Sequence, residues 1–322
     1  MSDSTLVVPA PKQSNDNMDL LSRQIIVFTS PKAGSGANRE QVPRLEEMLS
    51  QRGLKCSVMH SPAELERLIK YAAEVGDQQP VVVCAGGDGT LGLVASKTLP
   101  ETPLLTMPMG TENLVGRMVG QSAEAESILK TLATGYLHRI DAATANGQLF
   151  LIMATAGFDA EVVRRLHLRR KGHIRRLSYL LPILNTLTRY QFPAIRVCEL
   201  DDDGSAVQVT TCRWAMAFNL PRYAAGLQIA PSAIGNDGKL DITAMCGSGI
   251  YKGIRYLYGA MTGRLDRQRD VCRFQTPRLR IESDQRVAFE LDGDYAGHLP
   301  VTIESLPMRV TLVVPEDFTP VR

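Results

Sequence analysis

The segment GGDGT at 86–90 has the residue types of a phosphate-binding loop and directly follows the apolar run PVVVCA. Its three glycines would let the backbone turn tightly and approach a phosphate with exposed N–H groups. Thr90 would lie near the start of the next helix, where its hydroxyl can cap the helix or bind an anion. These residue types therefore predict an anion site at this turn.

Asp88 is the unexpected member of this loop, because a carboxylate repels phosphate. It fits if it binds Mg²⁺, orients a hydroxyl group or caps the following helix. No Gly-Lys-Ser/Thr follows, so the loop lacks the lysine of the common P-loop. From these residues alone, a plain tight turn with Asp88 as a helix cap is an equal alternative.

The elements around this loop alternate between short apolar runs and segments with helical spacing, which predicts a parallel α/β layer. Ligands of such sheets lie at the carboxyl ends of the strands. The glycine-bearing loops 31–36, 86–90 and 108–113 all leave expected strands at that edge. The expected strands are 23–30, 55–60, 80–85 and 103–109, and the expected helices are 37–53 and 61–76.

The pattern changes near residue 138, after which β-like runs joined by turns predominate. Asn146-Gly147 is a strong hairpin signal between two of these runs. The fold class predicted is α/β plus β, with an N-terminal parallel sheet and a C-terminal antiparallel β-sandwich. The expected parts are a disordered tail (1–20), an α/β domain (21–138) to which 306–322 returns, and a β-rich domain (139–305) with a helical insertion (163–190).

The bulk composition favours a globular protein of a reducing compartment. The chain has 322 residues, a net charge of +2 and six scattered cysteines that form no CxxC pair. No apolar run approaches the roughly 20 residues that span a bilayer, and the N-terminal segment does not resemble a signal peptide. We therefore expect a cytoplasmic location, and the near-zero net charge argues against nucleic acid as a partner.

A basic stretch is visible in the expected insertion, since no Asp or Glu lies between Val162 and Cys198. One interpretation is a solvated helix face packed on the β domain. The other is peripheral docking on an anionic membrane surface, to which each cation contributes about 1 kcal/mol. Few aromatic residues accompany these cations, which again disfavours nucleic acid. The cations are Arg164, Arg165, Arg169, Arg170, Lys171, Arg175 and Arg176.

The GGDGT loop resembles the signature of the diacylglycerol kinase catalytic-domain family. This family includes bacterial lipid kinases and the sphingosine and ceramide kinases, with NAD kinases and phosphofructokinases as more distant relatives. Five other segments resemble family motifs in the same order, so that the resemblance covers about 23–315. They are SPKAGSG (30–36), MPMGTENLVGR (107–117), AGFDAEV (156–162), APSAIGNDGKLDI (230–242) and FELDGDYAG (289–297).

The resemblance implies an ATP site in the α/β domain and a lipid site in the β-rich domain. The implied ATP-site residues are Gly86, Gly87, Asp88, Gly89, Thr90, Thr111, Asn113 and Lys32. The base that takes the proton of the lipid hydroxyl would be Asp294 or Asp88, and Asp292 would support either arrangement. We prefer Asp294 as base, with Asp88 on the side of Mg²⁺ and phosphate.

The turn NDGKLD has two interpretations. Asp237-Gly238 is a good turn between strands on its own. In the bacterial kinases that it resembles, this turn holds a structural Mg²⁺ through the Asp side chain and flanking carbonyls. Those positions here would be Asp237, Ile234 and Lys239.

The predicted function is that of an ATP- and Mg²⁺-dependent lipid kinase, peripherally associated with membranes, acting on diacylglycerol, a sphingoid base or ceramide. The sequence departs from the family at Ser30 (usually Asn), Leu114 (often Asp) and Asp294 (usually Glu). These departures keep open a catalytically weak homologue that binds nucleotide or lipid. An NAD kinase is a second alternative, although the Asn-Glu substrate motif of that family is missing. Whether the protein forms a homodimer is left open.

Overall fold

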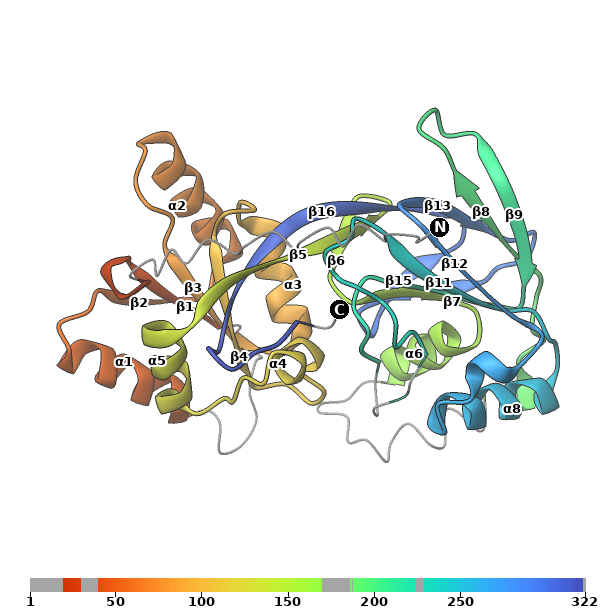
Figure 1. Cartoon of the computed structure of the whole chain (residues 1–322), viewed down its shortest axis with the longest axis horizontal. Helices are drawn as coiled ribbons and strands as arrows, with labels where there is room; N and C mark the ends of the chain where they lie inside the picture. The colour runs from red at the N-terminus through yellow and green to blue at the C-terminus, as the bar shows by residue number, and fades with distance from the viewer. Residues whose placement is uncertain are drawn as a thin grey trace, which may run out of the picture.

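The computed structural model describes residues 20–29, 40–169, 186, 188–223, 227 and 229–320. Figure 1 shows an α/β unit at one end of an elongated molecule and a β-rich unit at the other. The chain forms a ten-stranded sheet and a six-stranded sheet within these ranges. Outside the described residues lie Ser30, Lys32, Arg170, Lys171, Arg175, Arg176 and all of the expected tail 1–20 except Leu20.

The α/β unit contains the predicted parallel sheet, with strand order β2-β1-β3-β4. Alternate residues of β1 face opposite layers: Ile26 packs in the cluster of α2 and α3, and Val27 packs in that of α1 and α5. Helices therefore cover both faces of these strands. The strands are β1 (Ile25–Thr29), β2 (Cys56–Met59), β3 (Val81–Gly86) and β4 (Pro103–Pro108). The helices are α1 (Gln41–Gln51), α2 (Pro62–Glu74), α3 (Asp88–Lys97), α4 (Leu114–Met118) and α5 (Ala125–Thr134), after a 3₁₀ turn, η1 (Leu20–Ser22).

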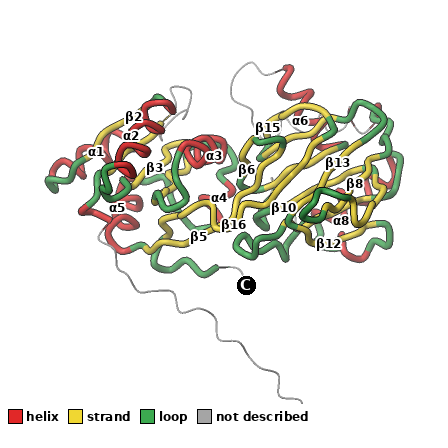
Figure 2. The backbone as a smooth tube through the Cα atoms, turned by 90° about the horizontal axis from the view of Figure 1, so that it is seen from above, coloured by secondary structure: helices red, strands yellow, loops and turns green. Residues whose placement is uncertain are grey.

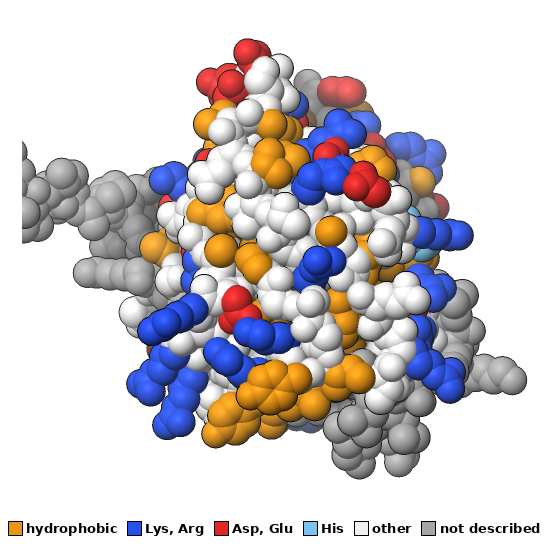
Figure 3. Space-filling model, turned by 90° about the vertical axis from the view of Figure 1, so that its right-hand side faces the viewer, with side chains coloured by type: hydrophobic (Ala, Val, Ile, Leu, Met, Phe, Trp, Pro, Cys, Tyr) orange, Lys and Arg blue, Asp and Glu red, His pale blue; other side chains and the backbone are white. Residues whose placement is uncertain are grey.

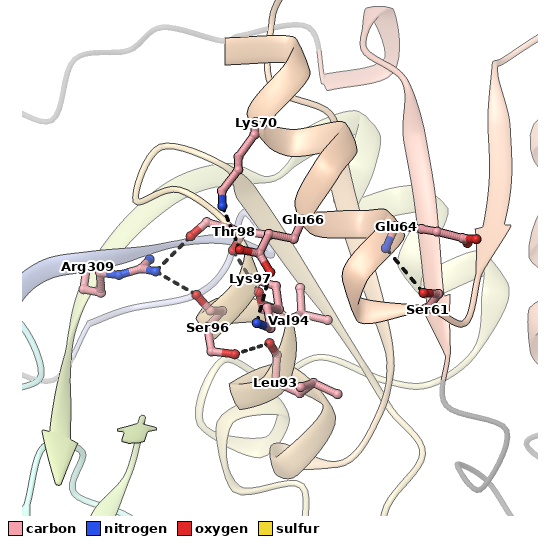
Figure 4. Close-up of polar contacts among 11 residues, drawn as sticks. Ser61, Glu64, Glu66, Lys70, Leu93, Val94, Ser96, Lys97, Thr98 and Arg309 are labelled. Atoms are coloured by element: carbon pink, nitrogen blue, oxygen red, sulfur yellow. Dashed lines mark hydrogen bonds and ion pairs between the residues drawn. The ribbon is translucent and has the colours of Figure 1, made fainter. Parts of the chain in front are cut away.

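Polar contacts fix α3, the helix that begins in the glycine loop. Glu66 of α2 pairs with Lys70 at 2.8 Å and with Lys97 of α3 at 3.0 Å (Figure 4). At the end of α3, Arg309 donates hydrogen bonds to the carbonyl oxygens of Ala95 and Thr98 at 2.9 and 2.8 Å. Because Arg309 belongs to the long strand β16 (Val301–Val314), the C-terminal part of the chain holds α3 in place.

The β-rich unit contains the six-stranded sheet, with order β12-β11-β10-β7-β14-β15, and its strands are all antiparallel. This confirms the predicted antiparallel half of the fold. A buried cluster that includes Ala143, Ala215 and Leu279 joins this sheet to the larger one. Its strands are β7 (Met153–Ala156), β10 (Trp214–Phe218), β11 (Leu240–Met245), β12 (Val271–Thr276), β14 (Ala288–Leu291) and β15 (Asp294–His298).

The larger sheet passes through both units (Figure 2). Strand β16 pairs along most of its length with β5 (Tyr136–Ala145). Its other edge pairs with β13 (Arg278–Glu282) near its start and parallel to β4 near its end. Residue 138, the predicted boundary, therefore lies within β5. The remaining strands are β6 (Gln148–Phe150), β8 (Ile195–Leu200) and β9 (Ala206–Cys212), and Asn146-Gly147 makes the predicted hairpin between β5 and β6 with φ angles of 48° and 84°.

Two helices lie on the same side of the β-rich unit (Figure 1). The first, α6 (Phe158–Arg169), starts five residues before the expected insertion and packs on β7, β14 and β15. The second, α8 (Ile250–Met261), is followed by the 3₁₀ turn η5 (Leu265–Arg267). The expectation of a single helical interruption was wrong here. Gly249 precedes α8 without a side-chain cap, so the sequence carries no clear helix start at this point.

Candidate active site

Two glycine loops meet at the edge of the parallel sheet. Strand β3 ends at Gly86, and Gly87 is the N-cap of α3. The carbonyl oxygen of Gly86 accepts a hydrogen bond from Met109 N–H at 2.8 Å. A Cβ atom on Gly110 would lie only 2.7 Å from the Cα atom of Gly87, so a larger residue would force the two backbones apart. The loops 86–90 and 108–113 thus form one surface.

Asp88 joins the same two loops. Its carboxylate accepts hydrogen bonds from the N–H groups of Leu114 at 2.8 Å and Val115 at 3.0 Å. It therefore caps α4, whereas a cap on its own helix was one of the roles that the sequence left open. Burial raises the pKa of this carboxyl, and the two N–H donors oppose that shift.

The other predicted ATP-site residues near this surface shape the loops. Thr90 packs on Gly86 so closely that a Cβ atom there would lie 2.2 Å from the threonine Oγ1. The Asn113 side chain accepts from Gly110 N–H and donates to the Gly110 carbonyl oxygen, both at 2.8 Å. Thr111 is exposed between these two residues. Contact of Gly86, Gly87, Gly89, Thr90, Thr111 and Asn113 with ATP stays a prediction, and Lys32 lies outside the described residues.

Asp294 reaches this surface from the other unit. Asp292 and Gly293 have φ angles of 50° and 89°, and they form the turn that connects β14 to β15. Asp294 follows this turn as the exposed first residue of β15. Its Oδ2 atom lies 3.6 Å from the position that a Cβ atom would take on Gly89. The two aspartate-glycine motifs therefore face each other across the two units.

Asp292 fixes the turn that presents Asp294. Its carboxylate accepts three backbone hydrogen bonds, from Leu151 and Ile152 at 2.8 Å and from Met153 at 3.0 Å. Burial, together with the nearby Asp88 charge, raises the pKa of Asp292 to about 6 although these donors favour the anion. With its lone pairs used in this way, Asp292 is suited to holding the turn.

A buried pair of carboxyl groups behind this turn was missed in the sequence. The Thr155 hydroxyl oxygen lies 2.7 Å from Asp159 Oδ1 and 2.9 Å from Glu290 Oε1. A hydroxyl has one proton to donate, so its second contact requires a proton from a carboxyl group. Burial raises the pKa of both carboxyl groups, and for Glu290 the charge of Asp159 adds to the shift. The pair therefore shares a proton.

Other donors also reach this pair. Asp159 accepts from Trp214 Nε1 at Oδ1, at 2.9 Å, and from the Tyr223 hydroxyl at Oδ2, at 2.6 Å. Glu290 accepts from Gly293 N–H at 2.6 Å. The carboxyl pair is thus connected to the turn that carries Asp294.

An apolar cavity of about 300 Å³ opens beside these carboxylates. Asp88, Glu112 and Asp292 contribute polar groups to its lining. Most of the remaining wall comes from apolar side chains of α6, α8 and the smaller sheet. They include Phe158, Val162, Trp214, Met245, Leu257 and Ala260. The cavity therefore combines a largely apolar wall with a few carboxylates.

In the NDGKLD turn, where the sequence predicted Mg²⁺, one carboxylate oxygen of Asp237 serves to stabilise the turn itself. Asp237 is exposed, and its Oδ1 atom accepts the Lys239 N–H at 3.0 Å. The buried Asp141, which the sequence did not single out, accepts from Gly238 N–H and Met308 N–H, both at 2.7 Å. Within the described ranges, no three Asp, Glu, His or Cys side chains form a group that could hold a metal ion. Mg²⁺ at Asp237, Ile234 and Lys239 stays a prediction.

Two of the cations expected at a membrane are paired within their own helix. Arg164 and Arg165 both donate to the Glu161 carboxylate at 2.7 Å. Arg169 is the last residue of α6, and its side chain is not among those described. In the part of the chain that the structure describes, no helix is long and apolar enough to cross a bilayer.

The fold and the site together define a kinase-like protein of two units. Residues 24–145 match the model of the diacylglycerol kinase catalytic domain. Residues 153–314 match that of the YegS C-terminal NAD kinase beta sandwich-like domain. The chain belongs to the diacylglycerol kinase and YegS-like lipid kinase family that carries these two domains.

Relatives along nearly the full length support this assignment. The chain is 26% identical over 307 residues to the diacylglycerol kinase of Bacillus subtilis (strain 168), covering 92% of this chain and 98% of the relative. It is 28% identical over 266 residues to a "Probable lipid kinase YegS-like" of Pseudomonas putida (strain KT2440), covering 81% and 85%. A crystal structure of a diacylglycerol kinase from Bacillus anthracis str. Sterne has the same fold, with a TM-score of 0.66, 22% identity and 91% and 98% coverage.

Proposed function

We propose that this protein is an ATP-dependent kinase that phosphorylates a hydroxyl group of diacylglycerol or of a related lipid such as a sphingoid base or ceramide. The observation that carries this proposal is that Asp88 belongs to both halves of the site. It lies in the glycine loop, and it also lines the apolar cavity. A lipid chain in the cavity would present its hydroxyl group next to a phosphate at the start of α3.

Asp294 is the residue best placed to accept the proton of that hydroxyl. It is exposed and lies against Gly89, where the γ-phosphate of ATP would be held. In the transfer, the lipid oxygen forms a bond to the γ-phosphorus, the bond to the leaving ADP oxygen breaks, and the proton moves to the Asp294 carboxylate. The α/β unit would hold the phosphate at Gly89, and the β-rich unit would supply Asp294. The relative position of the two units would therefore set the reaction geometry.

Asp88 suits a different role, because it is partly buried and each of its oxygens already accepts one backbone N–H. A carboxylate oxygen retains lone-pair capacity after one such bond, so Asp88 fits as a Mg²⁺ ligand. Mg²⁺ would arrive with ATP and neutralise phosphate charge when bound. Asp88 itself keeps the two loops in register.

Transfer of labelled phosphate from ATP to a panel of lipids tests the proposal. We expect a phosphorylated lipid with the wild type and at least a hundredfold loss with Asp294→Asn. Asp202→Asn, in the exposed hairpin between β8 and β9, is the matched control and should leave turnover unchanged. No lipid product, or NADP formed from NAD in the same assay, would overturn the assignment.

Binding can be followed without turnover, because Trp214 is the single tryptophan of the chain and lines the cavity. A lipid chain that fills the cavity should shift Trp214 emission to shorter wavelength. Such a shift with no ATP consumption on any lipid would favour a binding protein without activity over a kinase.

A further inference from the structure

Helix α8 is apolar on two opposite faces. Its inner face, with Gly253, Tyr256 and Ala260, is buried. Its other face carries large apolar side chains that are between 44% and 74% exposed. We name this set the α8 outer face, and it consists of Ile250, Tyr251, Ile254, Tyr258 and Met261. A surface helix normally turns polar side chains outward, so this face is suited to an apolar partner.

The charges beside the α8 outer face are mainly positive. No Asp or Glu occurs from 242 to 265, and of the acids that follow, Asp266 pairs with Arg273 and Asp270 pairs with Lys252. Four exposed arginines lie in α8 and in the segment that packs on it, and we name them the cationic rim: Arg255, Arg264, Arg267 and Arg269. Figure 3 shows hydrophobic side chains along the lower edge of this face of the molecule, with Lys and Arg side chains beside them.

The helix is held firmly in this orientation. The Tyr256 hydroxyl donates to Asp270 at 2.8 Å and accepts from Gly247 N–H at 2.7 Å. Leu265 of η5 packs on Gly259, where a Cβ atom would lie 3.2 Å from the leucine Cα. The outward position of the apolar side chains is therefore built into the packing of the helix.

The same helix forms part of the wall of the apolar cavity. Tyr256, Leu257 and Ala260 line the cavity from inside, one helix width from the outer face. An apolar partner in contact with the α8 outer face would thus lie next to the cavity proposed for the lipid chain.

We propose that the α8 outer face and the cationic rim dock the protein on the surface of an anionic lipid bilayer. Aromatic and aliphatic side chains would enter the headgroup region while the arginines pair with lipid phosphates. A second copy of this chain is a poorer partner, because a twofold contact between identical faces would bring arginine rims together. Passage of a lipid into the cavity rests on the proposed kinase function, whereas the docking itself does not.

Flotation with vesicles, in the absence of ATP, tests the docking directly. We expect binding to vesicles of phosphatidylcholine mixed with phosphatidylglycerol, and little binding to phosphatidylcholine alone or in high salt. Ile254→Ser with Tyr258→Ser should weaken binding roughly tenfold or more by removing apolar contact. Arg267→Gln with Arg269→Gln should weaken it roughly 25-fold, about fivefold for each cation.

Matched controls remove similar groups elsewhere. Val207→Ser with Val209→Ser replaces exposed apolar side chains of β9, and Lys55→Gln with Arg67→Gln replaces exposed cations of the α/β unit. Both controls should bind vesicles like the wild type. Because the substituted α8 side chains are exposed, thermal unfolding should be unchanged, and Tyr251→Ser with Met261→Ser gives an independent second variant.

The outcomes separate this proposal from the kinase assignment. α8 variants that bind anionic vesicles like the wild type would overturn the docking, as would a wild-type dimer in sedimentation that Ile254→Ser dissociates. If docking is right, these variants lose turnover on bilayer lipid and keep it on a dispersed short-chain lipid. If the kinase assignment fails, no lipid is phosphorylated, yet the pattern of vesicle binding remains.

Discussion

The Asp294 carboxylate faces Gly89, with Oδ2 lying 3.6 Å from the position of a Cβ atom on that glycine. The two residues come from different units, and each belongs to a motif built from aspartate and glycine. The site is therefore formed between the start of α3 and the start of β15. The space between Gly89 and the Asp294 carboxylate would be filled by one methyl group.

Gly89→Ala should reduce activity without reducing stability. The added methyl group meets Asp294 at an ordinary contact distance, and alanine within a helix is worth about 0.5–1 kcal/mol over glycine. We expect unchanged or higher thermal stability with at least a tenfold loss of kcat/KM, because the methyl group occupies the space between the glycine loop and Asp294. Gly92→Ala is the control: nothing lies within 4 Å of its Cβ position, so it should stabilise equally and leave activity intact. Equal activity in both variants would contradict the site.

Asp88→Asn should destabilise the fold as well as reduce turnover. One oxygen of the pair that accepts Leu114 and Val115 N–H would become an NH₂ group and could no longer accept. A lost hydrogen bond of this kind costs about 1–3 kcal/mol, measurable by urea unfolding. An unchanged unfolding free energy would show that the cap on α4 contributes nothing.

The raised pKa of Asp292 predicts how the free energy of unfolding depends on pH. Its pKa is raised to about 6 in the folded protein, above that of the unfolded chain. Its stabilising contribution is therefore complete below about pH 4 and is lost as the pH rises through about 6. Chemical unfolding of the wild type over this window should show the decline. Asp292→Asn should remove this part of the decline, at the cost of one of three backbone hydrogen bonds.

Glu290→Gln should be tolerated, unlike Glu290→Ala. A glutamine can accept from Gly293 N–H and donate to the Thr155 hydroxyl, which then donates to Asp159. The amide N–H of glutamine, which does not titrate, takes the place of the shared carboxyl proton. We therefore expect unchanged or greater stability near neutral pH. Alanine leaves buried groups without partners and should destabilise by about 1–3 kcal/mol. Differential scanning calorimetry of the two variants gives the comparison, and equal losses would argue against proton sharing.

The sequence predicted the parallel sheet and the antiparallel half of the fold because their signals are local. Alternating elements and the Asn146-Gly147 turn both appear within short windows. The start of α2 is also a local feature, because the Ser61 side chain accepts the N–H of Glu64, three residues later, at 3.3 Å (Figure 4).

The buried carboxyl pair and the cavity depend on contacts between distant segments. Glu290 alternates with the apolar Phe289 and Leu291, a pattern that places it on the solvent side of a strand. In the fold, α6 packs on β14, and Glu290 is buried. Likewise, Leu257 and Ala260 line a cavity but have the composition of ordinary core. Only the packing distinguishes these roles.

Strand β16 has a consequence for the order in which the protein can fold. It is the last described strand along the chain, yet it is central in the large sheet, between β5 on one edge and β4 with β13 on the other. During synthesis on the ribosome, β4 and β5 must therefore wait with unpaired edges until this segment emerges. Helix α3, which begins in the glycine loop, acquires its Arg309 anchor at the same late moment, once residues 301–314 have emerged.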